Sequence, residues 1–153
     1  MPEFSSTYNA ILDDKRRVVL PAAFKKEMGE SFDRTFTVEI DPYEKCFNIY
    51  PAASWQERIA FVRSRLNPND QRQSKVLDKF YQNFVKINVA DNGRLNIPNA
   101  FLDRLGITRE VVFTGQGSKI RMWEAEAYRK AMMPDDDYPD AFAEFLGGPL
   151  NSF

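Results

Sequence analysis

Short apolar runs recur along the chain in two similar sets, each interrupted by polar turns. The first set predicts strands at residues 8–12, 18–20, 36–40 and 46–50, with a short helix from Ala22 to Met28 that Pro21 opens and Gly29 caps. The second predicts strands at residues 85–89, 95–97, 111–114 and 119–123, with a helix between Pro98 and Gly106. In each set we expect the first strand to pair with the second, and the third with the fourth.

The two sets are copies of one pattern. The sequence Arg-Val-Val-Leu-Pro-Ala-Ala-Phe at 17–24 returns as Arg-Leu-Asn-Ile-Pro-Asn-Ala-Phe at 94–101, an offset of 77 (94 − 17 = 77). The last strands correspond at an offset of 73, as Phe47 does to Ile120, so we place four extra residues (77 − 73 = 4) before the second strand pair of the first copy. A repeat of strands, turns and helix starts predicts two equivalent halves.

Two helical stripes lie between the copies. Apolar residues at 55, 59, 62 and 66 fall on one helix face, a polar break follows at 67–70, and apolar residues at 76, 77, 80, 81 and 84 mark a second amphipathic helix. We therefore divide the chain into a first repeat at 7–53, a helical insertion at 54–84, a second repeat at 85–129 and a tail at 134–153.

Charge is unevenly distributed along a nearly neutral chain of 21 basic and 22 acidic residues. The tail at 134–153 holds five acidic residues and no basic one, which leaves 21 basic against 17 acidic residues (22 − 5 = 17) in 1–133. A mildly basic body suits a nucleic-acid partner. The composition of the tail predicts disorder, with Phe142, Phe145 and Leu146 available to pack on the body or on a partner.

The composition also excludes most enzyme classes. The chain has no histidine and one cysteine, Cys46. It therefore lacks the commonest general base, the Ser–His and Cys–His nucleophile pairs and every His-containing metal site. We expect no catalytic residue, no metal and no cofactor. No apolar run approaches the ~18 residues that span a bilayer and no signal peptide is evident, so we expect no membrane partner and a cytoplasmic location.

The first polar turn carries the clearest chemistry. Asp13 ends one predicted strand and Arg17 begins the next, which places a carboxylate and a guanidinium across the neck of the turn. Such a carboxylate can fix the direction of the guanidinium, as recognition of a phosphate or of a guanine edge requires. For an isolated turn, the alternative is an Asp–Arg clip that only fastens the turn.

Repetition favours the binding interpretation. Arg94 occupies the position of Arg17 in the second half, so a two-fold arrangement would present both arginines side by side. Because the first turn is tight, we expect Lys15 and Arg16 to project into solvent. The predicted DNA-binding residues are Asp13, Lys15, Arg16, Arg17, Asn92 and Arg94.

These residues also carry a family resemblance. The segments Leu-Asp-Asp-Lys-Arg-Arg-Val-Val-Leu-Pro at 12–21 and Gly-Arg-Leu-Asn-Ile-Pro at 93–98 resemble the two turns of the MraZ family. Residues 48–51 with Trp55, and 122–124 with Tyr128, are similar to the family's segments at the same positions. The resemblance implies an α+β, β-rich fold in which the halves intertwine as a pseudo-dimeric, AbrB-like swapped-hairpin barrel with the helical insertion between them.

The resemblance further implies a function. It implies a transcriptional regulator of the division and cell-wall gene cluster, associated with the nucleoid and assembled as a ring-like homo-oligomer. Such a protein binds double-stranded DNA at short G-containing direct repeats upstream of its own operon. The family's Asp-x-x-x-Arg motif falls on Asp13 and Arg17.

The chain departs from the family pattern at two positions. Arg16 replaces the usual glycine of the first turn, and we expect the turn geometry to change because a glycine-type positive φ is lost. In the second turn Ala90 stands where the motif has its acid, and a carboxylate comes one residue later at Asp91. Either the second half lacks an orienting carboxylate, or Asp91 supplies it from a shifted position.

A second function stays open at this point: an oligomeric, non-enzymatic interaction protein whose turns bind an acidic protein partner. Salt-dependent binding of duplex DNA with a sequence preference distinguishes the two functions. Four phosphates contacted by Lys15, Arg16, Arg17 and Arg94 predict a log–log salt slope of about −3.6 for each protomer.

Overall fold

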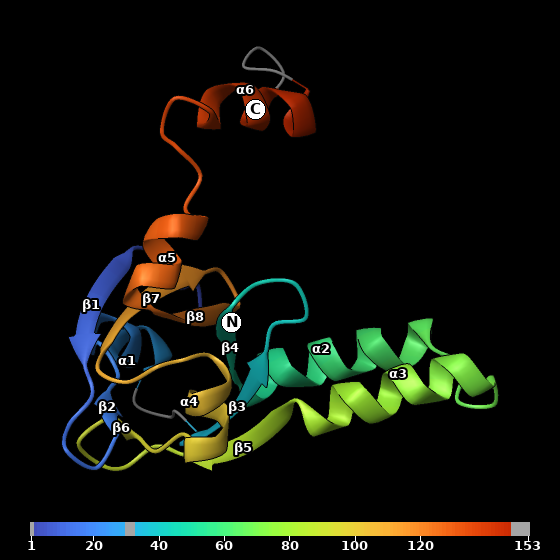
Figure 1. Ribbon diagram of the computed structural model, residues 1–153, viewed down its shortest axis with the longest axis horizontal. Helices are drawn as coiled ribbons and strands as arrows, with labels where there is room; N and C mark the ends of the chain where they lie inside the picture. Colours follow the sequence, from blue (N-terminus) through green and yellow to red (C-terminus); the bar gives the residue numbers. More distant parts are fainter. Residues whose placement is uncertain (1, 30–32, 148–153) are drawn as a thin grey trace.

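The computed structural model describes residues 2–29 and 33–147 and has a mixed α/β body, from which a helical hairpin and a last helix project (Figure 1). The elements of the first half are β1 (Thr7–Ile11), β2 (Val18–Val19), α1 (Ala22–Met28), β3 (Thr35–Ile40) and β4 (Cys46–Pro51). The hairpin comprises α2 (Ala52–Arg65) and α3 (Gln71–Gln82). The remaining elements are β5 (Phe84–Asn88), β6 (Arg94–Leu95), α4 (Asn99–Arg104), β7 (Glu110–Gln116), β8 (Lys119–Glu124), α5 (Ala125–Ala131) and α6 (Tyr138–Leu146).

A six-stranded antiparallel sheet forms most of the body, in the order β1-β7-β8-β4-β3-β5, and β2 and β6 form a separate two-stranded sheet. The prediction of a mixed, β-rich fold is confirmed in this coarse form. Strands β1 and β5 are the two edges of the large sheet, so within the described residues the sheet is open and not closed into a barrel. None of the helices in this part of the chain is both long and apolar enough to cross a membrane.

Strands of the two halves are interleaved in the large sheet, with β7 and β8 of the second half lying between β1 and β4 of the first. The first strand of each half pairs with the third strand of the other, β1 with β7 and β5 with β3, while β4 pairs with β8. The predicted pairs β3–β4 and β7–β8 are confirmed. The predicted pairing of each first strand with its second strand is wrong, because β2 and β6 are only two residues long and pair with each other instead.

The strand register corrects the alignment of the two halves. Ala10 pairs with Val111 and Ile87 pairs with Phe36, so β1 and β5 correspond at an offset of 77 (87 − 10 = 77) but β3 and β7 at 75 (111 − 36 = 75). In the middle of the sheet Phe47 pairs with Met122, and Ile49 pairs with Ile120. These two pairs are equivalent if Phe47 corresponds to Ile120, so β4 and β8 correspond at an offset of 73 (120 − 47 = 73). Two of the four extra residues therefore precede β3 and two lie in the β3–β4 turn, rather than all four preceding the hairpin.

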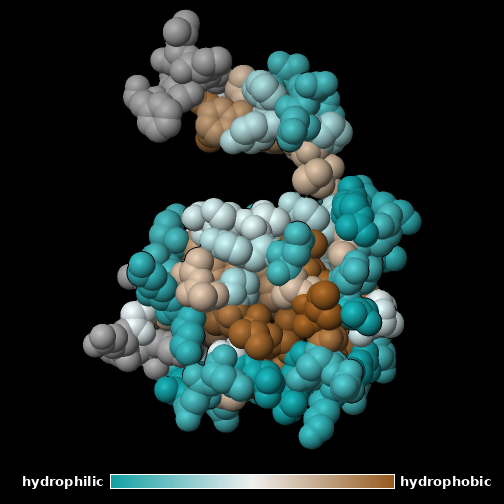
Figure 2. All heavy atoms as spheres, turned by 90° about the vertical axis from the view of Figure 1, so that its left-hand side faces the viewer, coloured by the Kyte–Doolittle hydropathy of each residue, from teal (hydrophilic) through white to brown (hydrophobic). Residues whose placement is uncertain are grey.

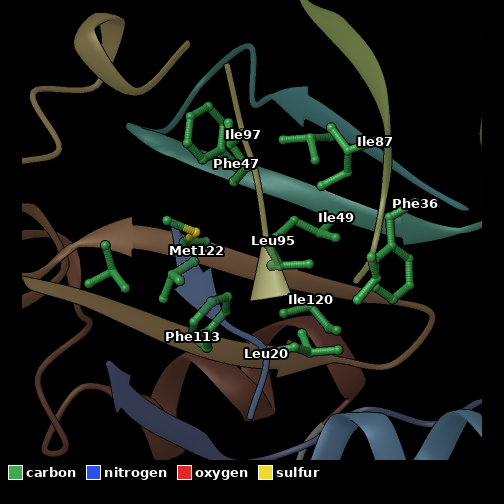
Figure 3. Close-up of a cluster of buried hydrophobic side chains, with 14 of the residues drawn as sticks. Leu20, Phe36, Phe47, Ile49, Ile87, Leu95, Ile97, Phe113, Ile120 and Met122 are labelled. Atoms are coloured by element: carbon green, nitrogen blue, oxygen red, sulfur yellow. The ribbon is translucent and has the colours of Figure 1, made fainter. Parts of the chain in front are cut away.

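The core fixes the short strands against the large sheet. Leu20, Leu95 and Ile97, from the chain at and just beyond β2 and β6, are at most 2% exposed. In Figure 3 they lie among the inward side chains of the large sheet, which are Phe36, Phe47, Ile49, Ile87, Phe113, Ile120 and Met122. Burial of apolar side chains of this size contributes about 1.5–3 kcal/mol each, which makes β2 and β6 rigid supports for the turns that precede them.

The helices predicted from apolar spacing are present. Helix α1 has the predicted bounds and buries Phe24. In the hairpin, Trp55 of α2 stacks on Phe80 of α3 with ring centroids 6.0 Å apart. Asp70, in the predicted break, caps α3 by accepting a hydrogen bond from the Gln73 N–H at 3.0 Å.

The tail differs from its prediction. Residues 138–146, where composition predicted disorder, form helix α6; the final stretch, 148–153, lies outside the described residues. Pro139 sits in the first turn of α6, where its missing N–H costs no helical hydrogen bond, and apolar residues recur at 138, 142, 145 and 146 on one face.

Candidate nucleic-acid interface

The first turn is organised by the carboxylate of Asp13. Its Oδ1 accepts hydrogen bonds from the backbone N–H groups of Lys15 and Arg17, each at 2.9 Å, and its Oδ2 accepts one from Arg17 Nε at 3.1 Å. The Asp13 N–H donates to the Arg17 carbonyl at 2.8 Å and closes the neck of the turn. The carboxylate thus fixes both the backbone of the turn and the direction of the Arg17 guanidinium.

The same carboxylate also holds the arginine of the second half. Arg94 Nε lies 3.7 Å from Asp13 Oδ2, the oxygen that Arg17 uses. The two-stranded sheet brings the arginines together, because Val18 pairs with Leu95 and Val19 with Arg94. The structure therefore places Arg17 and Arg94 side by side around one acid, with their side chains 30% and 35% exposed.

The second turn is built without an acid at Ala90. Its backbone repeats the first turn, since the Ala90 N–H donates to the Arg94 carbonyl at 3.1 Å, and Asn92 Oδ1 accepts from the Arg94 N–H at 3.1 Å. Asp91 forms an ion pair with Arg34 rather than with Arg94. Of the two alternatives left open by the sequence, the one in which Asp91 orients Arg94 from a shifted position is therefore not the one seen, and Arg94 instead forms an ion pair with Asp13 of the other half.

Arg16 behaves differently from its prediction. It retains a positive φ of 61°, close to the 80° of Gly93 at the equivalent position, so the turn geometry is not changed by the loss of glycine. A non-glycine residue in this region is strained by about 1–2 kcal/mol. The Arg16 guanidinium donates from one nitrogen to Asp103 Oδ1 at 2.8 Å and to the Ile107 carbonyl at 2.9 Å, so it ties the turn to the α4 region instead of projecting freely into solvent.

The remaining predicted residues have distinct surroundings. Lys15 is exposed at the turn, as predicted. Asn92 is also exposed, but its side-chain oxygen is used within the turn. Lys25 of α1, which sequence reasoning missed, donates from Nζ to the Asp91 carbonyl at 3.0 Å and adds a cation beside the second turn. No local sequence signal joins residues 25 and 91, because the contact depends on the pairing of β2 with β6.

The surface around these turns is mixed in character. Figure 2 shows apolar residues exposed across the side of the body that faces left in Figure 1, where β1 and β2 lie, with hydrophilic residues bordering them. In those strands Ile11 and Val19 are 56% and 51% exposed. A cavity of about 510 Å³ beside α5 is lined by no residue of either turn.

A second polar cluster, unforeseen from the sequence, lies on the large sheet. Asp41 Oδ2 accepts from Asn48 Nδ2 and from Arg121, both at 2.9 Å, and Glu39 holds Arg58 through two hydrogen bonds of 3.1 and 2.7 Å. Burial alone would raise the pKa of Asp41, but the hydrogen bonds from Asn48 and from backbone N–H groups lower it below its ordinary value. Its charges are paired, so we assign this cluster to stability rather than to binding.

The described residues contain no group of three or more His, Cys, Asp or Glu side chains that could hold a metal ion. The arrangement around Asp13 can instead receive an anion or the edge of a base. Two neighbouring guanidinium groups, that of Arg17 fixed by a hydrogen bond and that of Arg94 by an ion pair to the same acid, suit the planar recognition that phosphate and guanine require.

Protonation should not control this interface near neutral pH. The hydrogen bond from the Arg17 N–H holds the pKa of Asp13 below its ordinary value of 3.8, and the Lys15 N–H and the Arg17 charge act in the same direction against desolvation. Because folding lowers this pKa, the contacts of the carboxylate persist above the ordinary value and are lost only as pH falls through the lowered one.

We therefore expect the affinity for duplex DNA to change by less than about twofold between pH 5.5 and 7.0, since the chain has no histidine and Asp13 stays ionised. Fluorescence anisotropy at constant ionic strength measures this. A fivefold loss within the interval would show that another titrating group controls binding.

Comparison with known proteins identifies the family of this chain. The family model described as MraZ protein matches residues 4–77 and 80–138. A transcriptional regulator MraZ of Bacteroides thetaiotaomicron is 26% identical over 146 residues, covering 95% of this chain and 94% of its own. The protein of the same name from Lachnoclostridium phytofermentans is 29% identical over 144 residues, covering 93% and 96%.

The relatives are named as regulators and not as enzymes, in agreement with the non-enzymatic interpretation of the sequence. The family match covers both turns, both sheets and all of the helical hairpin except residues 78–79. The chain belongs to the MraZ family.

Proposed function

We propose that this protein is a sequence-specific DNA-binding transcriptional regulator that contacts duplex DNA through Arg17 and Arg94. The observation that carries the proposal is the single carboxylate, Asp13, with Arg17 Nε at 3.1 Å and Arg94 Nε at 3.7 Å from the same oxygen. The names of the relatives support the regulatory role. Residues on turns that a rigid core supports are suited to recognition.

Each arginine would pair with O6 and N7 of a guanine in the major groove, which discriminates between bases by about 1–3 kcal/mol. Lys15 would contact a phosphate and fix the position of the turn on the duplex. Arg16 would act indirectly by holding the turn through Asp103 and Ile107. Arg16, which the sequence predicted to contact DNA, is therefore not among the direct contacts proposed here.

We further propose that several copies act together on short direct repeats upstream of the protein's own division and cell-wall operon. One copy offers few contacts, so it would bind weakly at physiological salt. A ring-like homo-oligomer would convert later contacts into intramolecular ones and add about 10²–10⁴ in affinity. The pairing of the first strand of each half with the third strand of the other supports an AbrB-like, swapped-hairpin relationship between them.

The salt dependence of binding can distinguish the proposed phosphate contact of Lys15 from the indirect role of Arg16. Replacing Lys15 by Ala should reduce the magnitude of the log–log salt slope by about 0.9 for each engaged copy, because one phosphate contact is lost. Replacing Arg16 by Gly should leave the slope unchanged, since glycine keeps the positive φ of 61° and the lost guanidinium contacts no phosphate. Anisotropy titrations from 50 to 200 mM salt measure both slopes; equal reductions would return Arg16 to the direct contacts.

The function itself is tested by titrating a duplex from the upstream region of the protein's own operon against a scrambled duplex of equal length. We expect at least tenfold preference for the upstream duplex and a steep loss of affinity with salt. Equal and weak binding of both duplexes would contradict the proposal and favour an acidic protein as the partner of the turns.

A further inference from the structure

Helix α6 exposes apolar side chains of a kind that the body buries. Tyr138, Phe145 and Leu146 are 57%, 80% and 53% exposed. Figure 1 shows the helix held beyond α5, and in Figure 2 it stands apart from the body with hydrophobic residues on one side and hydrophilic residues on the other. A helix of nine residues is marginal in water on its own, so this face requires a surface on which to pack.

A groove with the matching character lies between the helical hairpin and the end of β3. Its volume is about 290 Å³, and its apolar lining comprises Ile40, Pro42, Tyr43, Val62, Leu66, Val76 and Phe80. Two of these side chains are open to solvent, with Tyr43 93% and Val76 48% exposed. The groove therefore offers exposed apolar surface against which a docked helix could bury its own apolar residues.

The charges of the helix and the groove are opposite. Lys79 and Arg58 line the groove together with Glu39, which pairs with Arg58, and α2 and α3 together hold six basic and two acidic residues, a net charge of +4 (6 − 2 = 4). Residues 134–147 hold five acidic residues and no basic one. Complementary charge of this kind brings the two surfaces together and orients them.

The helix and the groove lie on separate sides of one chain. Figure 1 shows α6 above α5, while the α2–α3 hairpin projects from a different side of the body. The connection from α5 to α6 is residues 132–137, which reach at most about 20 Å when extended. An arm on one side and a groove on another are the parts of a head-to-tail contact between copies.

We propose that α6 of one copy docks in the groove formed by α2, α3 and β3 of a second copy, with Phe142, Phe145 and Leu146 against its apolar lining. The acidic residues of the helix then face the basic residues of the hairpin. This inference concerns assembly of the chain and does not depend on the DNA-binding role of the turns.

Site-directed cross-linking of the full-length chain tests the docking. One tagged variant carries Ala141→Cys, on the apolar face of α6 between the anchoring side chains, and a co-produced variant with a different tag carries Val76→Cys in the groove. Cys46 does not compete, because it is 0% exposed and burial raises its pKa to about 12. The matched control is Asp78→Cys, an exposed position on the other side of α3.

With a short bismaleimide, we expect the Ala141→Cys and Val76→Cys pair to yield at least ten times more cross-linked heterodimer than the Ala141→Cys and Asp78→Cys pair. Adding Asp140→Lys and Glu144→Lys to the α6 variant should reduce the heterodimer at least fivefold. Equal yields from Val76→Cys and Asp78→Cys would overturn the proposal. So would a chain carrying both Ala141→Cys and Val76→Cys that cross-links only within itself, since α6 would then pack on its own body.

Discussion

Replacing Arg17 by Ala is expected to lower the affinity for repeat-containing duplex DNA by about 100-fold or more. The variant loses the guanidinium that Asp13 holds at 3.1 Å, and with it the proposed guanine contact, which would be worth about 1–3 kcal/mol. Because several copies bind one operator in the proposed assembly, the loss recurs in each bound copy. Anisotropy titrations with the upstream duplex at fixed salt measure the change.

Three further variants serve as comparisons for the loss of affinity in Arg17→Ala. Arg94→Ala should show a smaller loss, since its Nε lies 3.7 Å from the shared carboxylate and is held less tightly. Asp13→Asn should weaken binding by about tenfold while leaving both cations in place. Arg129→Ala, which removes an exposed arginine paired with Glu126, is the control and should bind as the wild type does. Wild-type affinity in Arg17→Ala would refute the assigned interface.

Removing Arg58 should cause the largest loss of stability among single charge changes in the described part of the chain, about 3–5 kcal/mol in the free energy of unfolding. Glu39 is 1% exposed and depends on two hydrogen bonds from Arg58. Arg58→Ala leaves a buried charge without its partner, which is the costly way to break a buried ion pair. Urea unfolding at pH 7 measures the loss.

The double variant Glu39→Gln, Arg58→Ala separates this cause from general damage. It should be more stable than Arg58→Ala alone, because the unpaired charge is gone. The exposed pair of Arg129 and Glu126 again provides the comparison, and Arg129→Ala should cost less than about 1 kcal/mol. If the double variant were the less stable one, the contribution of Arg58 would come from its packing over the Phe80 ring instead.

Sequence periodicity predicted most elements of this fold, because each is amphipathic over its own length. The bounds of α1 and the start of β4 are as expected, and both helices of the hairpin are present. The partners of β1, β2, β5 and β6 were not predictable from local pattern. A short strand is compatible with its sequence neighbour or with a distant copy, and only burial of residues such as Val18 and Leu95 in a shared core decides between them.

The candidate site was likewise predictable from the sequence only in part. The paired turns and the Asp13–Arg17 contact follow from spacing, whereas the sharing of Asp13 by Arg94 depends on the pairing of β2 with β6. The positive φ of Arg16 could not be predicted from the sequence either, because its strain is offset by contacts with Asp103 and Ile107, which lie about 90 residues away.

The most direct measurement combines Arg17→Ala with single replacements of the guanines in the upstream repeat by 7-deazaguanine, which lacks the N7 acceptor. If an Asp13-held arginine reads a guanine edge, one such replacement will cost the wild type about 1–3 kcal/mol and cost Arg17→Ala nothing further. Equal costs in both proteins at every guanine would contradict direct base recognition by Arg17.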